Sequence, residues 1–456
     1  MRNIAAENNL EGLLFDHITK KLASIFNVDT DKQRIDSVHI KSNMRRLGRI
    51  GIFSTTIHKF LVNLNRHHKD LFESIDEKII DRYFSEKALS CFAMVKPSES
   101  SKTLLDVSSE LFDLVEQFKG NEVATNMHSY KLLKRVLKEQ CNLAATGKDK
   151  KITIKQPKEI PSNSLQNPSD PDATYSGHKG QGYQVQIMET YTDTEDEDIK
   201  AKTLNLITHV AVETACHSDA HAIKPAIELT KQRGLAPKEL EADTLYGGDD
   251  NCQYTKTENV ELVSPTHKTR NKKENDISVF TFSDSGHVIS CPEGQKPLIS
   301  KKKKTRFTQG FNPEKCAQCP SYPDCPVKWG KNHYYLRYEE KVMRLAKRRA
   351  EEQTDEFKQR YRWRAGVEAT MSEYNNKTGV KQLRVRGSKA VRFAAILKAI
   401  GVNIFRATAV RRARKEGSSQ GAGYFSILFQ IFKEQIRKWC NNTYIVVAEF
   451  QFITNM

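Results

Sequence analysis

Two aspartates stand in settings where a carboxylate could do chemistry. Asp36 lies inside a strand-like run, Gln33 to Ile40, and Asp243 stands between the apolar approach LEA and the sequence TLYGG. Carboxylates are depleted from strands and costly to bury, so Asp36 either faces solvent or has a partner such as a metal ion. Asp243 would end a short strand, where open α/β sheets bind ligands, although an Asp before Thr and Gly-Gly can simply form a turn.

A third carboxylate, Glu368, has candidate partners on its own helix. Tyr361, Arg364 and Glu368 are spaced at i−7, i−4 and i, which places them on one helix face. The guanidinium could hold a phosphate beside a metal-binding carboxylate there. The simpler alternative is an i,i+4 Arg–Glu ion pair, which adds only about a few tenths of a kcal/mol.

Three segments of the chain resemble the DDE transposases of bacterial insertion sequences, over about residues 36–400. The segments are QRIDSVHIKSNMRRLGRIGIF, ADTLYGGDDN and YRWRAGVEATMSEYNNKTGVKQLRVRG, in the family's order. The resemblance implies an RNase H-like catalytic core with Asp36, Asp243 and Glu368 as the acidic triad. Carboxylates are suitable ligands for two Mg²⁺ (or Mn²⁺) ions roughly 3.5–4 Å apart, which would activate the nucleophile and stabilise the leaving oxygen of a phosphodiester.

The resemblance extends to residues that would hold DNA. Tyr361 and Arg364 match the family's Tyr-x2-Arg-x3-Glu pattern. The lysine expected seven residues after the glutamate is replaced by Asn375, and Lys377 follows two positions later. We expect Tyr361, Arg364, Lys377, Arg384 and Arg386 to contact phosphates.

Asp170 and Asp172 are rival candidates for the first carboxylate. They lie in DPDATYSGHKG, a loop flanked by Pro and Gly just before a predicted strand. An Asp-Pro-Asp turn explains them more simply, so Asp36 is preferred.

Four cysteines form a second candidate site. Cys291, Cys316, Cys319 and Cys325 follow the pattern C-x24-C-x2-C-x5-C, and a Cys-x2-Cys pair can supply two thiolates to a tetrahedral Zn²⁺. The alternative is a set of buried or unpaired thiols. The odd total of nine cysteines does not suit a disulfide framework. The Lys run at 301–304 lies in the same loop, where it would face DNA or only solvent.

The charge of the chain favours a polyanionic partner. The 456 residues include 73 basic and 56 acidic residues, a formal net charge of +17. Residues 377–415 carry basic residues and no acidic one, which favours double-stranded DNA, as transposon ends and target, over a membrane. No phosphate-binding GxxxxGK[ST] loop, HExxH or GxSxG motif is present, which removes support for motors, zincins and serine hydrolases.

No run of about 18 uncharged apolar residues and no secretion signal is evident, so we expect a cytoplasmic, nucleoid-associated protein. The apolar spacing predicts an amphipathic helix over 7–27, helices over about 50–142, and a helix near 222–235 closed by Gly234. Strands are predicted near 33–40, 182–191, 206–215, 238–248 and 260–265.

The predicted organisation is a mixed α/β core with insertions. Its parts are an N-terminal helix (1–32, a remnant of a DNA-binding region), the first catalytic strand with a helical insertion (33–142), a polar connection (143–182), the central strands and helix (183–270), a Cys-rich insertion (271–335), the catalytic helix with a basic helical region (336–415) and a C-terminal tail (416–456).

The expected function is metal-dependent cleavage and strand transfer of DNA by a homodimer assembled on DNA. Because only one helix precedes Asp36, we expect a transposase shortened at its N-terminus, with salt-sensitive and largely non-specific DNA affinity. The alternative is a catalytically inactive DNA-binding protein derived from a transposable element.

Overall fold

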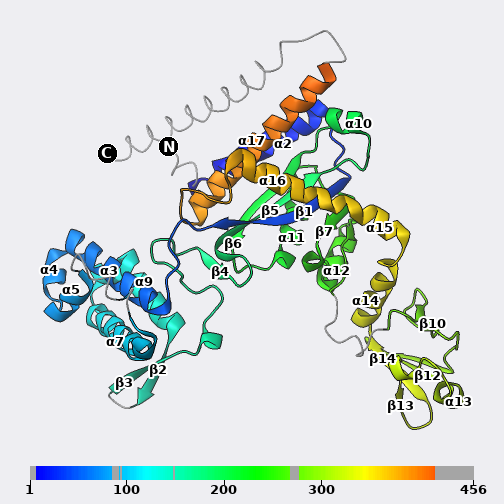
Figure 1. Ribbon diagram of the computed structural model, residues 1–456, viewed down its shortest axis with the longest axis horizontal. Helices are drawn as coiled ribbons and strands as arrows, with labels where there is room; N and C mark the ends of the chain where they lie inside the picture. The colour runs from blue at the N-terminus through cyan, green and yellow to red at the C-terminus, as the bar shows by residue number, and fades with distance from the viewer. Residues whose placement is uncertain (1–6, 85–91, 93–94, 147–148, 268–276, 416–456) are drawn as a thin grey trace, which may run out of the picture. The chain divides into compact units, whose positions relative to one another are not determined.

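The computed structural model describes all residues except 1–6, 85–91, 93–94, 147–148, 268–276 and 416–456 (Figure 1). The predicted helix and strand of the C-terminal tail lie outside the described residues. The chain divides into a large unit, Met1–Asp193 with Asn205–Phe405, and a small unit, Thr194–Leu204 with Arg406–Met456. In the small unit, Arg414 Nε donates to the Lys202 carbonyl at 2.7 Å, which joins the end of one helix to another.

A six-stranded mixed sheet is the centre of the large unit (Figure 1). Its strands are β1 (Lys32–Lys41), β4 (Thr174–Ser176), β5 (Gly180–Thr190), β6 (Ile207–Thr214), β7 (Glu239–Ala242) and β8 (Glu261–Val263). The order is β4-β5-β1-β7-β8, with β6 also paired to β5. β5 is antiparallel to β1 and β6, whereas β1, β7 and β8 are parallel. The predicted strands, including the one that carries Asp36, therefore do share one sheet.

The two faces of this sheet differ in chemistry. One face is apolar: Ile35, Met188 and Leu240 pack against α11 (Ile223–Gln232) in a buried cluster. Gly234, with a φ of +71°, follows this helix as predicted, because the left-handed conformation suits a glycine. The helix α12 (Asp249–Thr257) between β7 and β8 was not predicted, since its polar sequence DDNCQYTKT has no apolar stripe.

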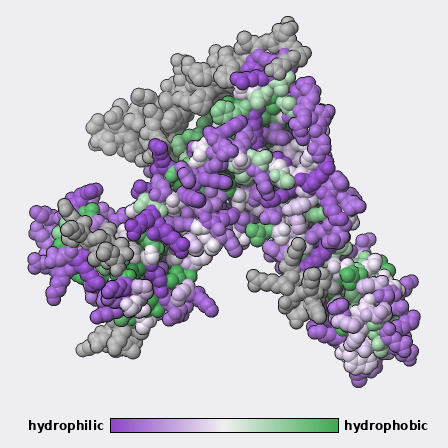
Figure 2. Space-filling model, viewed as in Figure 1, coloured by the Kyte–Doolittle hydropathy of each residue, from purple (hydrophilic) through white to green (hydrophobic). Residues whose placement is uncertain are grey.

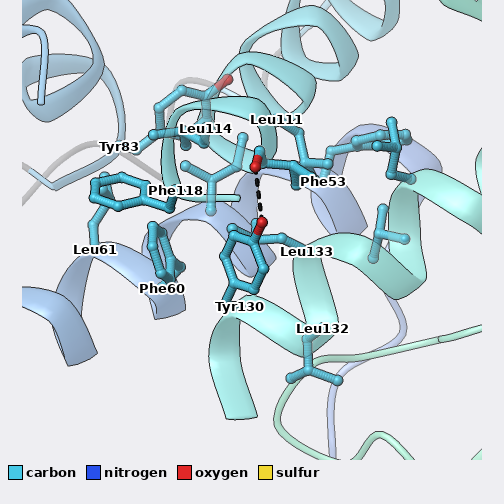
Figure 3. Close-up of a cluster of buried hydrophobic side chains, with 14 of the residues drawn as sticks. Phe53, Phe60, Leu61, Tyr83, Leu111, Leu114, Phe118, Tyr130, Leu132 and Leu133 are labelled. Atoms are coloured by element: carbon cyan, nitrogen blue, oxygen red, sulfur yellow. Dashed lines mark hydrogen bonds between the residues drawn. The ribbon is translucent and has the colours of Figure 1, made fainter. Parts of the chain in front are cut away.

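The helical insertion between β1 and β4 has its own core. Its helices are α3 (Arg49–His67), α4 (Lys69–Glu73), α5 (Glu77–Phe84), α7 (Ser100–Phe118), α8 (Glu122–Asn126) and α9 (His128–Gln140). Figure 3 shows aromatic and leucine side chains from α3, α7 and α9 packed together, with the Tyr130 hydroxyl donating to the Val115 carbonyl at 2.8 Å. The predicted helices over about 50–142 are confirmed, and η1 (Pro97–Glu99) precedes α7.

The predicted polar connection, 143–182, is partly wrong. Strands β2 (Cys141–Thr146) and β3 (Asp149–Ile154) pair as an antiparallel hairpin. The sequence KITI at the end of β3 alternates as in a strand, but the lysines and the glycine around it favoured the prediction of a polar connection. A further short helix, α10 (Glu197–Lys202), occupies the small unit, where the Asp196 side chain caps its first turn.

The cysteine segment is a small β-rich region. It contains β9 (Thr281–Phe282), β10 (Val288–Ser290), β11 (Ile299–Lys303), β12 (Arg306–Phe311), α13 (Pro313–Ala317), η5 (Tyr322–Asp324), β13 (Lys328–Trp329) and β14 (Tyr334–Glu339). The Lys run expected in a loop lies mostly in β11, and Lys302 pairs with Glu340 at 2.6 Å. Helical structure begins at Glu340, in α14 (Glu340–Glu351), later than the predicted 336.

The N-terminal and final described helices match the expected positions. α2 (Leu10–Phe26) is the predicted amphipathic helix. α17 (Ser388–Lys415) is long and apolar enough to cross a membrane by length and composition alone. It is also a core helix, since Val391, Ala395 and Ala399 are buried and the Asn403 amide exchanges hydrogen bonds of 2.8 and 2.9 Å with the Ile207 backbone. Figure 2 shows that the described surface in this view is mostly hydrophilic.

Candidate active site

The pairing of β1 with β7 brings the two candidate catalytic aspartates, Asp36 and Asp243, next to each other. The parallel register aligns Arg34 with Glu241 and Ile35 with Ala242, and ends there. Asp36 and Asp243 are the next residues on the two neighbouring strands. In a strand successive side chains point to opposite faces, so Asp36 lies on the face of Arg34 and opposite to Ile35. Asp243 keeps an extended backbone, with φ −68° and ψ 165°, just before η4 (Thr244–Tyr246).

The face that carries Arg34 and Asp36 is polar and is covered by the helix of Glu368. Arg34 and Glu189 are opposite each other on β1 and β5 and form a buried ion pair at 2.8 Å. Thr370 of α16 (Gly366–Thr378) donates to both oxygens of Glu189 at 2.7 and 2.8 Å. These bonds fix α16 on the sheet and thereby set the position of Glu368.

Arg364 connects two of the three candidate carboxylates. Its Nη2 lies 2.7 Å from Asp36 Oδ2 and its Nη1 lies 3.4 Å from Glu368 Oε1. The side chains of Arg364 and Asp36 are only 16% and 19% exposed, whereas that of Glu368 is 74% exposed. The i,i+4 Arg–Glu pair expected as the simple alternative is therefore present, but the same guanidinium also binds a carboxylate from a distant strand.

The electrostatics of Asp36 reflect several neighbouring charges. Burial raises the pKa of Asp36, while the Arg364 guanidinium and the Ser37 backbone N–H act in the opposite direction. The carboxylates of Asp243 and Asp219 raise this pKa further, which shows that they lie close enough for their charges to act.

The sequence predicted one continuous helix around Tyr361, but the structure shows an interrupted one. α15 (Asp355–Tyr361) is followed by the 3₁₀ turn η6 (Arg362–Ala365) and then by α16. At Gly366, where α16 begins, the chain passes so close to Arg34 that a Cβ would stand 2.2 Å from Arg34 Nη1. Tyr361 stacks on Phe357, with ring centroids 5.7 Å apart, and burial raises the pKa of its hydroxyl.

The other predicted phosphate-binding residues are placed apart from these carboxylates. Lys377 pairs with Glu373 on its own helix at 2.7 Å. Arg384 is exposed, and Arg386 donates to the Asn43 side chain at 3.0 Å. Lys377 lies in the last turn of α16, and Arg384 and Arg386 lie in the segment between α16 and α17.

The rival aspartates have structural partners. Asp170 is 1% exposed and accepts hydrogen bonds from Ser42, Tyr183 and the Gly387 backbone at 2.6, 2.6 and 3.0 Å. Asp172 accepts from the Ser388 backbone at 2.8 Å, at the start of α17. Both aspartates attach the start of α17 to the sheet.

Sequence reasoning missed Arg34 and Glu189, the buried ion pair of the sheet that holds α16 in place. Arg34 Nη1 also donates to the Trp363 carbonyl at 2.7 Å, directly beside Arg364. The available signal was a charged residue within each of two predicted strands, because a buried charge needs a partner of opposite sign.

The donor atoms at this edge of the sheet determine which metal the site could hold. Within the described ranges, no three His, Cys, Asp or Glu side chains are grouped closely enough to hold a metal ion. The candidate donors at this edge are nevertheless carboxylate oxygens, which are the ligands that Mg²⁺ prefers.

One of the three comparisons with known proteins gave a match. Residues 290–408 match the family described as transposase DDE domain. This range contains Tyr361, Arg364 and Glu368 but neither Asp36 nor Asp243. The searches of curated proteins and of solved structures found no match. Residues 290–408 of this chain are therefore similar to the DDE domain of transposases.

Proposed function

We propose that this protein cleaves DNA at the ends of an insertion sequence and joins them to target DNA, with Asp36, Asp243 and Glu368 as metal-binding carboxylates. DDE transposases act on DNA and generally use a divalent metal such as Mg²⁺, and the family match covers the segment of Glu368. The observation that carries the proposal is the convergence of two neighbouring strands and a helix: the pairing of β1 with β7 ends at Ile35 and Ala242, directly before Asp36 and Asp243, and Arg364 contacts both Asp36 and Glu368.

The sheet order supports an RNase H-like core. Three antiparallel strands, β6-β5-β1, continue into two parallel strands, β7 and β8, with α11 before β7 and α12 before β8. We infer that the helical insertion and the cysteine segment are additions to this core.

The chain's own residues would perform distinct tasks. Asp36 and Asp243, fixed on rigid strands, would provide the preorganised donors, and a bound divalent ion would supply activation of the attacking oxygen and stabilisation of the leaving oxygen. Glu368 is exposed and held only by a 3.4 Å contact, so a small side-chain rotation could bring it inward. Arg364 would exchange its contact with Asp36 for a DNA phosphate, since a guanidinium binds either anion in the same geometry.

The test is nicking of DNA that carries the terminal repeats flanking this gene, with Mg²⁺ or Mn²⁺. We expect Asp36→Asn, Asp243→Ala and Glu368→Gln to abolish cleavage while DNA binding stays largely intact, because binding depends on basic residues. Matched controls are Asp250→Asn, an exposed carboxylate on α12, and Glu373→Gln on α16, which should both cleave normally. Equal cleavage by the wild type and the three site variants would refute the assignment, and binding without cleavage by the wild type would favour the inactive DNA-binding protein.

A further inference from the structure

Four cysteines far apart in sequence line a single pocket in the cysteine segment. The pocket has a volume of about 240 Å³. Cys291 follows β10, Cys316 lies in α13, Cys319 follows that helix, and Cys325 follows η5. All four side chains are partly exposed free thiols. The fold thus brings the distant Cys291 to the three cysteines of the FNPEKCAQCPSYPDCP segment.

A cation among these four side chains would hold them as thiolates, because a metal-coordinated thiol is deprotonated.

The backbone around the cysteines already donates hydrogen bonds toward sulfur. The Gln295 N–H lies 3.3 Å from Cys291 Sγ, in a turn closed by Gly294, whose φ is +73°. Donors of this kind orient metal-binding thiolates and share their negative charge.

We propose that Cys291, Cys316, Cys319 and Cys325 bind one structural Zn²⁺ ion. Four thiolates form a closed tetrahedral set with Zn–S distances of about 2.3 Å, and leave no position open for a substrate. In the described part of the chain no three of these side chains are yet grouped for ligation. The proposed site therefore forms by rotation of the thiols into the pocket that they line.

A zinc ion would stabilise this segment, which has only a small core of its own. Its strands are short, from 2 to 6 residues, and its buried core depends on a few aromatic side chains such as Phe307, Phe311 and Tyr338. Small cores of this kind commonly need a metal or disulfides for stability. The ion would join the turn after β10 to the turns around α13, which are otherwise linked by the hydrogen bond from Ser321 to Glu293.

The first experiment measures metals in the full-length protein, purified without chelator. We expect close to one zinc per chain and little iron. Replacement of zinc by Co²⁺ should give the intense near-ultraviolet charge-transfer bands and visible bands of a tetrahedral thiolate site. Protein without zinc that also fails to bind added Zn²⁺ or Co²⁺ would overturn the proposal, as would iron with acid-labile sulfide in place of zinc.

The second experiment assigns the ligands. Cys316→Ser and Cys319→Ser should each lower the zinc content at least about tenfold in soluble protein, because binding energy falls when a thiolate is lost. Cys216→Ser, a partly buried cysteine outside the segment, should keep its zinc. Wild-type zinc content in both variants would overturn the assignment of these ligands. Because zinc content and cobalt spectra do not depend on DNA cleavage, this result stands apart from the test of the proposed function.

Discussion

The helical insertion and the central sheet differ in what fills their interiors. Around α3, α7 and α9 the interior is mostly hydrocarbon, and buried hydroxyls there bond to backbone carbonyls, as Thr56 does to the Ile52 carbonyl at 2.6 Å and Tyr130 does to that of Val115. The interior of the sheet instead contains ionisable side chains, among them Arg34, Glu189 and Glu241, each at most 8% exposed.

The difference indicates what each region is built for. Apolar side chains gain free energy on burial without requiring a particular partner. Buried charges are costly and need exact geometry, so they add little net stability but constrain the groups that surround them. In the sheet these groups are Asp36, α16 and Arg364, which suggests that the polar face positions the proposed site while the helical insertion supplies stability to its own region.

The largest effect is expected from Arg34→Met. This change removes the guanidinium that pairs with the buried Glu189, and breaking a buried pair costs about 3–5 kcal/mol. Urea unfolding would measure the loss. The double variant Arg34→Met/Glu189→Leu should recover much of it without recovering cleavage, because α16 loses its anchor. A single variant within about 1 kcal/mol of wild type would show that the pair is not a constraint.

Leu133→Ala should be destabilising by about 2–5 kcal/mol through the cavity it leaves. Leu133 is fully buried in the cluster of Figure 3. Here we expect the remaining folded protein to cleave DNA at the wild-type rate, since no contact of the site is removed. Loss of cleavage per folded molecule would contradict the division of roles between the two regions.

A pH effect should distinguish the sheet from the helical insertion. His209 is 1% exposed on β6, and burial, together with the charge of Arg233, lowers its pKa to about 3. Because the pKa in the folded state is below the unfolded value of 6.5, the unfolded state binds the proton first, and stability falls as pH drops from about 6.5 toward 3.

Between pH 7 and pH 5, binding of this proton by the unfolded state lowers the free energy of unfolding by about 2 kcal/mol. His209→Leu should remove it, so that the variant loses about 2 kcal/mol less than wild type between these pH values. Leu133→Ala serves as the control and should keep the wild-type dependence. Identical pH dependence of the wild type and His209→Leu would argue against a buried neutral histidine.

The smallest effects come from one buried hydroxyl in each region. Tyr130→Phe removes the bond to the Val115 carbonyl, and Tyr246→Phe removes the bond to Gln186 Oε1 at 2.7 Å. Each should cost about 1 kcal/mol. Only Tyr246→Phe should also slow cleavage, because Tyr246 ends η4 directly after Asp243. Equal cleavage by both variants would place Tyr246 outside the machinery of the site.

Much of the fold could be predicted because periodicity is a local signal. The helix at 10–26, the strand around Asp36 and the helix closed by Gly234 each follow from apolar spacing or one glycine. The hairpin β2–β3 and the helix α12 were missed because lysine-rich or polar sequences hide their pattern, and pairing with a neighbour decides their structure. The triad itself remains a prediction, supported by the placement of two aspartates on neighbouring strands, directly after the last paired residues of β1 and β7.

By itself the sequence determined which residue types are available: a basic chain, carboxylates in three motifs, and a cysteine pattern that suits zinc. Only the tertiary structure decided which of them meet. Arg364 was expected to hold a phosphate or, as the simpler alternative, to pair with Glu368 on the same helix, but its shorter bond is to Asp36, 2.7 Å away on β1. The physical reason is that a helix specifies contacts three or four residues apart, whereas the approach of α16 to β1 depends on Gly366 and the buried Arg34–Glu189 pair.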